Sequence, residues 1–161
     1  MQPSIQITPE FAVLYPTASA RATECAMNLV FTANLLEKRI ATLLQPLYLT
    51  PASGLVLSIL ADAASALPPH AIADRLIISR ATVTGLLDSL ERRAYIRRLP
   101  HPSDRRMILA EITAAGRQAA SAFRPIVHQH QKEWLAVLGE TEQQQLLGML
   151  HRVQERLREA D

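Results

Sequence analysis

The sequence has 161 residues, enough for one compact domain or a small domain with helical extensions, so two large independent domains are excluded. Hydrophobic residues make up 48% of the chain but aromatic residues only 4%, which favours packed helices with a core of Ala, Leu, Ile and Val. The net charge is only +2, yet residues 75–106 hold eight arginines and three acidic residues, a local balance of 8 − 3 = +5. Such clustering indicates a nucleic-acid surface, because phosphates attract gathered cations; a solvated charged face is the alternative.

The sequence also predicts the cellular compartment of the protein. No apolar run approaches the roughly 18 residues of a membrane span, and the first residues, MQPSIQITPEF, do not join a basic region to an apolar one. We therefore expect a cytoplasmic protein without a membrane partner. Cys25 is the single cysteine and cannot form an internal disulfide, which agrees with a reducing compartment.

The first 48 residues divide into an arm and a long helix. Residues 1–20 contain three prolines and no sustained period, which predicts an extended N-terminal arm. From about Arg21 to Leu44, apolar residues recur every three or four positions, which predicts a helix that Pro46 closes. We assign residues 21–48 to a dimerisation helix.

Residues 49–112 are predicted to form a winged helix-turn-helix domain. Its first helix begins at Thr50-Pro51, with a hydroxyl at the N-cap and proline at the first helical position, and runs to about Ala61. A short helix follows at about His70 to Leu76, with Ala73 and Leu76 facing inward, and Ser79 caps another that reaches about Arg93. The close spacing of these two helices is typical of a helix-turn-helix. The buried stripe of the second is predicted to be Val83, Leu86, Leu87 and Leu90.

Two strand-like runs, YIRRL (95–99) and MILAEI (107–112), complete this domain as a β-hairpin, or wing. They are separated by PHPSDRR (100–106), whose prolines and Ser-Asp pair favour a protruding loop. Arg97 and Arg98 alternate sides of the first strand, so we expect at most one of them to face phosphate.

Residues 113–161 are predicted to form C-terminal dimerisation helices. The first runs from Thr113 to about Leu138, and the second begins with Thr141 and Gln144 as a capping box. With the 21–48 helix they carry more apolar surface than a small winged helix can cover, which predicts a homodimer. The expected fold class is mostly α: a winged helix-turn-helix with long dimerisation helices and a small β-hairpin wing.

The exposed side of the 79–93 helix has the chemistry of a groove-reading helix. Its side chains are small or carry hydroxyls, which lets the backbone approach base edges in a major groove roughly 12 Å wide. An ordinary amphipathic surface helix is the alternative, but such helices usually expose long Lys, Glu and Gln side chains. The predicted DNA-binding residues here are Ser79, Arg80, Thr82, Thr84, Gly85 and Arg92.

The loop of the wing supplies a second predicted DNA contact. Arg105 and Arg106 are candidates to enter the minor groove, where a narrow groove concentrates negative potential. Asp104 can pair with a neighbouring arginine and fix its direction. A surface ion pair of little energetic value is the alternative.

Three segments together resemble the MarR family of winged-helix transcription regulators: LTPASGLVLSIL, HAIADRLIISRATVTGLLDSLERRAYIRR and HPSDRRMILAEITAAG. The resemblance extends in outline over residues 21–158. It implies a DNA-binding regulator, usually a repressor, that acts as a homodimer through its first, fifth and sixth helices on a pseudo-palindromic operator. It also implies release by a small ligand, often an anionic aromatic compound. The implied pocket residues are Leu29, Ala33, Leu36 and Leu57.

The chain departs from the family pattern at three positions. His101 stands where an acidic residue usually precedes the wing proline, so a local ion pair is expected to be missing. Ala94 and Ile77 stand where glycine is frequent. An alanine at positive φ costs on the order of 1 kcal/mol, so the turn at Ala94 is expected to differ.

Other functions compete with DNA binding as readings of this sequence. Cys25 lies roughly where peroxide-sensing relatives carry a reactive cysteine, so redox sensing is an alternative. His128 and His130 point about 200° apart on their helix and cannot chelate one ion; packing of His130 on Trp134 is the simpler reading, and no metal or other cofactor is expected. No catalytic constellation is recognisable, so no enzyme is expected. A winged helix that binds protein or RNA also remains open.

Overall fold

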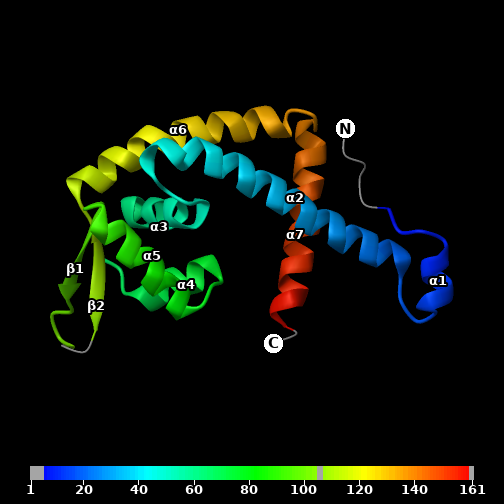
Figure 1. Cartoon of the computed structure of the whole chain (residues 1–161), viewed down its shortest axis with the longest axis horizontal. Helices are drawn as coiled ribbons and strands as arrows, with labels where there is room; N and C mark the ends of the chain where they lie inside the picture. Colours follow the sequence, from blue (N-terminus) through cyan, green and yellow to red (C-terminus); the bar gives the residue numbers. More distant parts are fainter. Residues whose placement is uncertain (1–5, 105–106, 160–161) are drawn as a thin grey trace.

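The computed structural model describes residues 6–104 and 107–159. These ranges hold α1 (Glu10–Leu14), α2 (Ala20–Leu44), the 3₁₀ helix η1 (Gln45–Leu47), α3 (Pro51–Asp62), α4 (Pro69–Leu76), α5 (Arg80–Arg92), β1 (Ile96–Pro100), β2 (Ile108–Ile112), α6 (Ala114–Leu135) and α7 (Glu140–Arg158). The fold is mostly helical with one antiparallel hairpin, as predicted (Figure 1).

The helix-turn-helix and the wing form one packed unit. Strand β1 pairs with β2 in antiparallel register from Ile96 opposite Ile112 to Pro100 opposite Ile108. On the other edge of β2, Ala110 exchanges backbone hydrogen bonds of 2.8 and 3.0 Å with Leu67. The segment before α4 therefore adds a one-residue third strand to the hairpin, which ties the base of the wing to the helices.

The core lies where the inner face of α5 meets α3, α4 and the hairpin. Val83, Leu87 and Leu90 are buried as predicted, whereas Leu86 is only half-buried. In α4 the fully buried residue is Ile72, which the sequence pattern did not single out; Ala73 is buried and Leu76 is half-buried. Their packing partners include Val56, Leu57, Ile96, Ala110 and Phe123.

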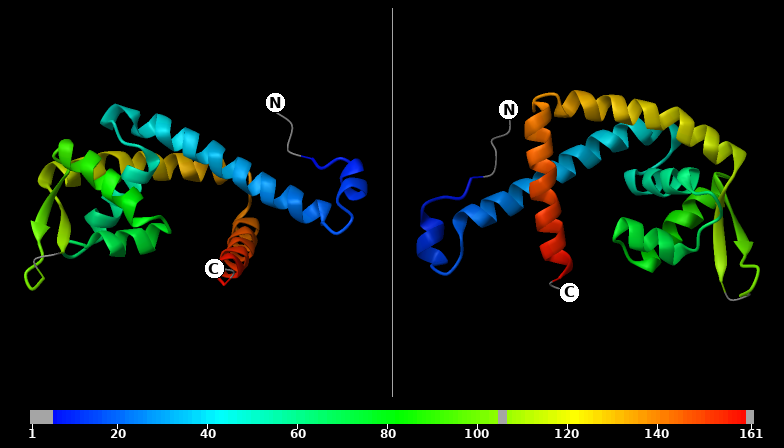
Figure 2. Two further views of the ribbon diagram at one scale, coloured as in Figure 1. Left: turned by 60° about the horizontal axis from the view of Figure 1, so that its bottom comes forward. Right: turned by 180° about the vertical axis from the view of Figure 1, so that it is seen from behind.

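The long helices extend away from this unit. Helices α2 and α6 pack against each other and against α3, while α7 turns away from the end of α6 (Figures 1 and 2). Arg124 of α6 makes a bidentate ion pair with Asp62 at the end of α3, with distances of 2.8 and 3.0 Å. Within the described ranges, a bilayer could not be crossed by any one helix; only α2 with η1 and α3 jointly reach the required length and apolarity, and that pair is bent by 70°.

The N-terminal region differs from the predicted arm of residues 1–20. It contains the short helix α1, where the ring of Phe11 contacts that of Tyr15, the C-cap residue, in a tilted arrangement with centroids 5.1 Å apart. Helix α2 begins inside the predicted arm, at Ala20, because the Ser19 hydroxyl caps it by accepting the Ala22 N–H at 3.2 Å. The prolines delimit α1 rather than exclude helix.

The C-terminal helices also begin and end at other residues than predicted. Helix α6 ends at Leu135, not Leu138, and the predicted capping box of Thr141 and Gln144 is wrong. Helix α7 begins two residues earlier, because the Glu142 carboxylate accepts the Gly139 N–H at 2.7 Å. Acidic side chains in this first turn suit the positive end of the helix. The predicted packing of His130 on Trp134 is confirmed, with ring centroids 5.7 Å apart.

The turn at Ala94 takes the conformation expected of glycine. Ala94 has a φ of 57°, so the expectation of a different turn is wrong, and Ile77 has a φ of 54°. Ala94 is held because its N–H donates to the Glu91 carbonyl at 2.8 Å and its carbonyl accepts the Thr113 hydroxyl at 2.7 Å. These bonds offset a strain of about 1 kcal/mol.

At the junction of the wing with α6, position 116 has room only for glycine. A Cβ at Gly116 would lie 2.1 Å from the Tyr95 carbonyl oxygen, so we expect Gly116→Ala to lower the free energy of unfolding by about 3 kcal/mol. The control is Gly85→Ala, where a Cβ meets no atom within 4 Å and helix propensity adds about 1 kcal/mol. Denaturant unfolding measures both, and equal stabilities would contradict the close packing of α6 on the wing.

Candidate nucleic-acid interface

The exposed face of α5 is set by the burial of its other face. Because Val83, Leu87 and Leu90 are buried, the opposite side of the helix faces solvent. These exposed residues are Arg80, Ala81, Thr82, Thr84, Gly85, Asp88 and Arg92. Apart from the two arginines and Asp88 they are small or carry hydroxyls, so a narrow, nearly flat helix surface is available to a partner.

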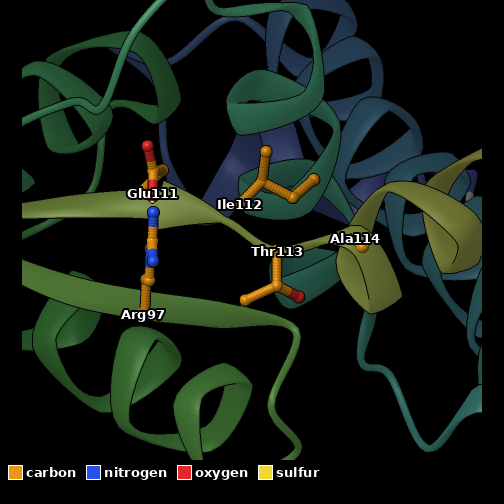
Figure 3. A pocket seen from close by; sticks show the side chains of 5 residues that line it. All are labelled: Arg97, Glu111, Ile112, Thr113 and Ala114. Atoms are coloured by element: carbon orange, nitrogen blue, oxygen red, sulfur yellow. Dashed lines mark hydrogen bonds and ion pairs between the residues drawn. The ribbon is translucent and has the colours of Figure 1, made fainter.

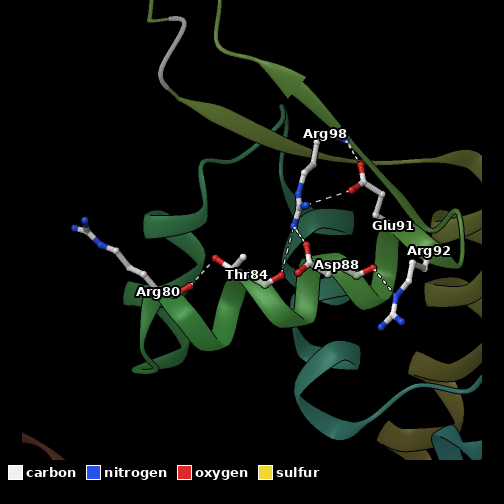
Figure 4. A network of polar contacts seen from close by, with 6 residues as sticks. All are labelled: Arg80, Thr84, Asp88, Glu91, Arg92 and Arg98. Atoms are coloured by element: carbon white, nitrogen blue, oxygen red, sulfur yellow. Dashed lines mark hydrogen bonds and ion pairs between the residues drawn. The ribbon is translucent and has the colours of Figure 1, made fainter.

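The hydroxyl groups on this face are oriented by contacts within the helix. Ser79 is the N-cap of α5: its Oγ accepts the Thr82 N–H at 3.1 Å and lies 2.8 Å from the Thr82 hydroxyl. The Thr84 hydroxyl donates to the Arg80 carbonyl at 3.0 Å (Figure 4). Thr84 therefore offers a partner an acceptor oxygen, whereas the Ser79–Thr82 pair retains one hydroxyl proton to donate.

The two arginines lie at opposite ends of α5. Arg80 is in the first turn and its side chain extends away from the helix (Figure 4). Arg92 is in the last turn, and its Nε donates to the Asp88 carbonyl at 3.3 Å, which leaves the rest of its guanidinium pointing outward. The helix thus presents a cation at each end of a small, polar middle.

Gly85 lies in the middle of the exposed face. A Cβ at this position would meet no atom of the protein within 4 Å. Glycine in a helix interior costs roughly 1 kcal/mol relative to alanine, and the fold gains nothing from it here. The residue is therefore better explained by the close approach of something outside the chain.

The loop of the wing is only partly described. Arg105 and Arg106 lie outside the described residues, so their predicted contact with DNA, and the predicted pairing of Asp104 with an arginine, stay predictions. His101 replaces the expected acidic residue: its Nδ1 accepts the N–H groups of Ser103 and Asp104, each at 3.3 Å. The imidazole thus stabilises the turn that leads into the arginines.

The arginines of strand β1 are engaged within the protein. Arg97 pairs across the hairpin with Glu111, and Arg98 reaches back to Asp88 and Glu91 of α5 (Figure 4). The alternation of the two residues was predicted, but this network was not. Two acidic residues three positions apart on an otherwise small-residue helix face were the signal that could have indicated it.

A surface pocket of about 310 Å³ lies at the base of the wing, beside the start of α6 (Figure 3). Its lining includes Arg97 and Glu111, which face each other across the hairpin. The residues of the implied ligand pocket lie elsewhere. Leu57 is fully buried in the core, whereas Leu29 and Ala33 are exposed and Leu36 is half-buried on α2; Cys25 is exposed on the same helix.

The sequence of this domain is similar to known transcription regulators. A sequence model described as the MarR family matches residues 49–108. The uncharacterized HTH-type transcriptional regulator YwaE of Bacillus subtilis is 33% identical over 92 residues, which cover 57% of this chain and 54% of YwaE. The chain thus spans about half the length of this relative. This relative is named as a transcription regulator.

Solved structures support the same fold. The MepR–DNA complex of Staphylococcus aureus superposes with a TM-score of 0.78 at 23% identity, over 81% of this chain and 96% of that one. CouR of Rhodococcus jostii RHA1, solved bound to p-coumaroyl-CoA, gives a TM-score of 0.73 at 22% identity, over 84% and 95% of the two chains. At these identities the likeness establishes the winged-helix fold.

Gly85 provides a test in which stability and binding move in opposite directions. We expect Gly85→Ala to stabilise the protein but to weaken its binding to duplex DNA about tenfold, because a methyl group holds the helix backbone away from the bases. Gly85→Gln is expected to weaken binding further. Fluorescence anisotropy on labelled duplex measures the affinity, and unchanged affinity in both variants would show that this part of α5 does not approach DNA.

Proposed function

We propose, from the premise that residues 49–108 form a MarR-family domain, that this protein is a sequence-specific DNA-binding transcription regulator acting as a homodimer. The observation that carries the proposal is the exposed face of α5, with a glycine that the fold does not need between two outward-facing arginines. A helix of this kind fits a major groove, where short side chains let hydroxyls and guanidinium groups reach base edges.

The predicted contacts divide into two groups. Arg80, Thr82, Thr84 and Gly85 meet the bases or lie closest to them, while Ser79 and Arg92, at the ends of the helix, contact the phosphate backbone. Arg105 and Arg106 enter the adjacent minor groove, with Asp104 orienting them. Residues 49–112 form the DNA-binding unit in this proposal. We favour duplex DNA over protein or RNA because the small-residue face lies between two outward-facing arginines, which suits a groove flanked by phosphates.

The long helices support the homodimer. Large apolar side chains are exposed along α2, α6 and α7, and a monomer in water rarely leaves so much apolar surface uncovered. A two-fold partner covers these faces and spaces two copies of α5 about one turn of DNA apart. The exposed residues are Met27, Leu29, Val30 and Leu35 on α2, Ile126 and Leu135 on α6, and Leu147, Met149, Val153 and Leu157 on α7.

The proposed regulation is repression on a pseudo-palindromic operator in the cytoplasm, relieved by a small anionic aromatic ligand. The ligand site lies along α2 at Leu29, Ala33 and Leu36; Leu29 and Ala33 are exposed and Leu36 is half-buried, so a ligand can reach them before a partner covers this face. Leu57, the fourth residue of the proposed site, is buried in the core on α3, which packs against α2. CouR, a structural neighbour solved with p-coumaroyl-CoA, supports a ligand of this class.

Selection of bound duplexes from a random library tests DNA recognition directly. We expect enrichment of an inverted repeat, and an affinity that falls steeply with salt because phosphate contacts release counterions. Arg106→Ala is expected to cost about tenfold or more in affinity while the dimer stays intact. Failure to enrich any duplex would reject the proposed function in favour of a protein- or RNA-binding module.

Sedimentation at micromolar concentration tests the dimer. We expect the wild-type protein to sediment as a dimer and Val153→Glu to shift it toward monomer, because a carboxylate on the apolar face of α7 would be desolvated. The matched control is Gln154→Glu, which adds the same charge at the next residue on an exposed polar position. A wild-type monomer, or equal effects of the two variants, would contradict the assignment of α7 to the interface.

A further inference from the structure

Arg98 makes the most extensive polar connection between the wing and the exposed face of α5 in the described residues. Its Nη2 lies 2.5 Å from Asp88 Oδ1 and 3.4 Å from the Thr84 carbonyl oxygen, and its Nη1 lies 3.3 Å from Glu91 Oε2. The other oxygen of Glu91 accepts the backbone N–H of Arg98 at 3.1 Å. One strand residue is therefore held at four points over two turns of α5 (Figure 4).

The neighbouring residue, Arg97, makes a different kind of ion pair. Arg97 pairs with Glu111 on the opposite strand, so its ion pair is internal to the hairpin and makes no connection to α5. Its side chain is 64% exposed, whereas that of Arg98 is 27% exposed. Arg97 can stiffen the hairpin, but of these two arginines it is Arg98 that ties the hairpin to the helix.

The outer part of the wing needs such a connection. The hairpin is anchored from its base to mid-strand by the burial of Ile96, Ala110 and Ile112 in the core. Farther out, Ile108 is half exposed and pairs only with Pro100, at the end of the ladder. A two-stranded hairpin has little stability of its own, so its direction beyond the base depends on contacts to its side. Arg98, which lies opposite Ala110 where this anchoring ends, supplies one on the α5 side.

The charges of this network matter for a surface that meets phosphates. Without Arg98, Asp88 and Glu91 would place two carboxylates beside the exposed face of α5. Arg98 neutralises one of these charges and, with its short paired contacts, directs both carboxylates at itself. The guanidinium is thereby engaged by two acids and a carbonyl, which leaves it poorly placed to bind a phosphate as well.

We propose that Arg98 is a positioning residue: it locks the wing to the reading helix, through Asp88 and Glu91, in the relative orientation that lets both enter their grooves. This inference rests on the proposed function in DNA binding. It makes the two acidic residues favourable for DNA binding although their charge alone opposes it. The network therefore predicts that removal of these two acidic residues weakens DNA binding, whereas their charge alone predicts that removal strengthens it.

The double variant Asp88→Ala/Glu91→Ala tests the direction of this change in DNA affinity. Removal of two negative charges from a DNA-facing surface should tighten binding if the carboxylates act only by their charge. We expect about tenfold weaker binding instead, because the wing is released from α5. The control is Glu111→Ala, which removes a negative charge and the Arg97 pair within the wing; its affinity should be unchanged or higher. Tighter binding by the double variant would overturn the proposal.

The salt dependence separates positioning from direct phosphate contact. We expect Arg98→Ala to lower affinity about tenfold at every salt concentration while the slope of log K against log salt stays that of the wild type. Loss of a phosphate contact would instead reduce the slope by about one unit, and that result would overturn the proposal. Arg98→Lys keeps the charge but not the fork of donors, so it should restore only part of the affinity.

Hydrogen exchange tests the lock without DNA, and so separates this inference from the proposed function. The Arg98 amide and the outer amides of the hairpin should exchange faster in Asp88→Ala/Glu91→Ala, while amides in α3 keep their wild-type rates. Unchanged hairpin exchange would overturn the lock even where the wild type binds DNA. Faster exchange in a protein that binds no duplex would reject the proposed function and leave the lock standing as a structural feature.

Discussion

The burial of one apolar stripe of α5 is the constraint on which the rest of the structure depends. Val83, Leu87 and Leu90 are fully enclosed by α3, α4 and the hairpin, so the rotation of the helix about its axis is fixed. A rotation of half a turn would expose these side chains and bury Arg80 and Arg92, at a cost of several kcal/mol. The small polar face is thus held outward by the core itself.

A second constraint joins the wing to the helices on either side. The Thr113 hydroxyl donates to the Ala94 carbonyl and accepts the Gly116 N–H, so the end of α5 and the start of α6 share one side chain. Gly116 then packs directly on the backbone of Tyr95. Because hydrogen bonds hold both the N–H and the carbonyl of Ala94, its positive φ is tolerated. The hairpin leaves the domain from a rigid base, and Arg98 guides its outer half.

Much of this arrangement could be predicted from the sequence, because apolar periodicity and capping residues act locally. The stripe of α5, its cap at Ser79 and the hairpin are examples. What could not be predicted depends on contacts distant in the chain. Arg98 meets residues seven to fourteen positions away, and no local pattern shows which of two adjacent arginines turns toward the helix. The start of α7 was misplaced because Glu142 outcompetes the expected hydroxyl cap.

The ion pair of Asp62 with Arg124 gives the molecule a mechanical property. It joins the end of α3 to the middle of the 22-residue α6, one residue before Pro125. Proline lacks the N–H that would bond to the preceding turn, so α6 loses a helical hydrogen bond at this point, and a contact from outside the helix limits bending there. The end of α3 therefore braces α6 at the position where its own backbone hydrogen bonding is weakest.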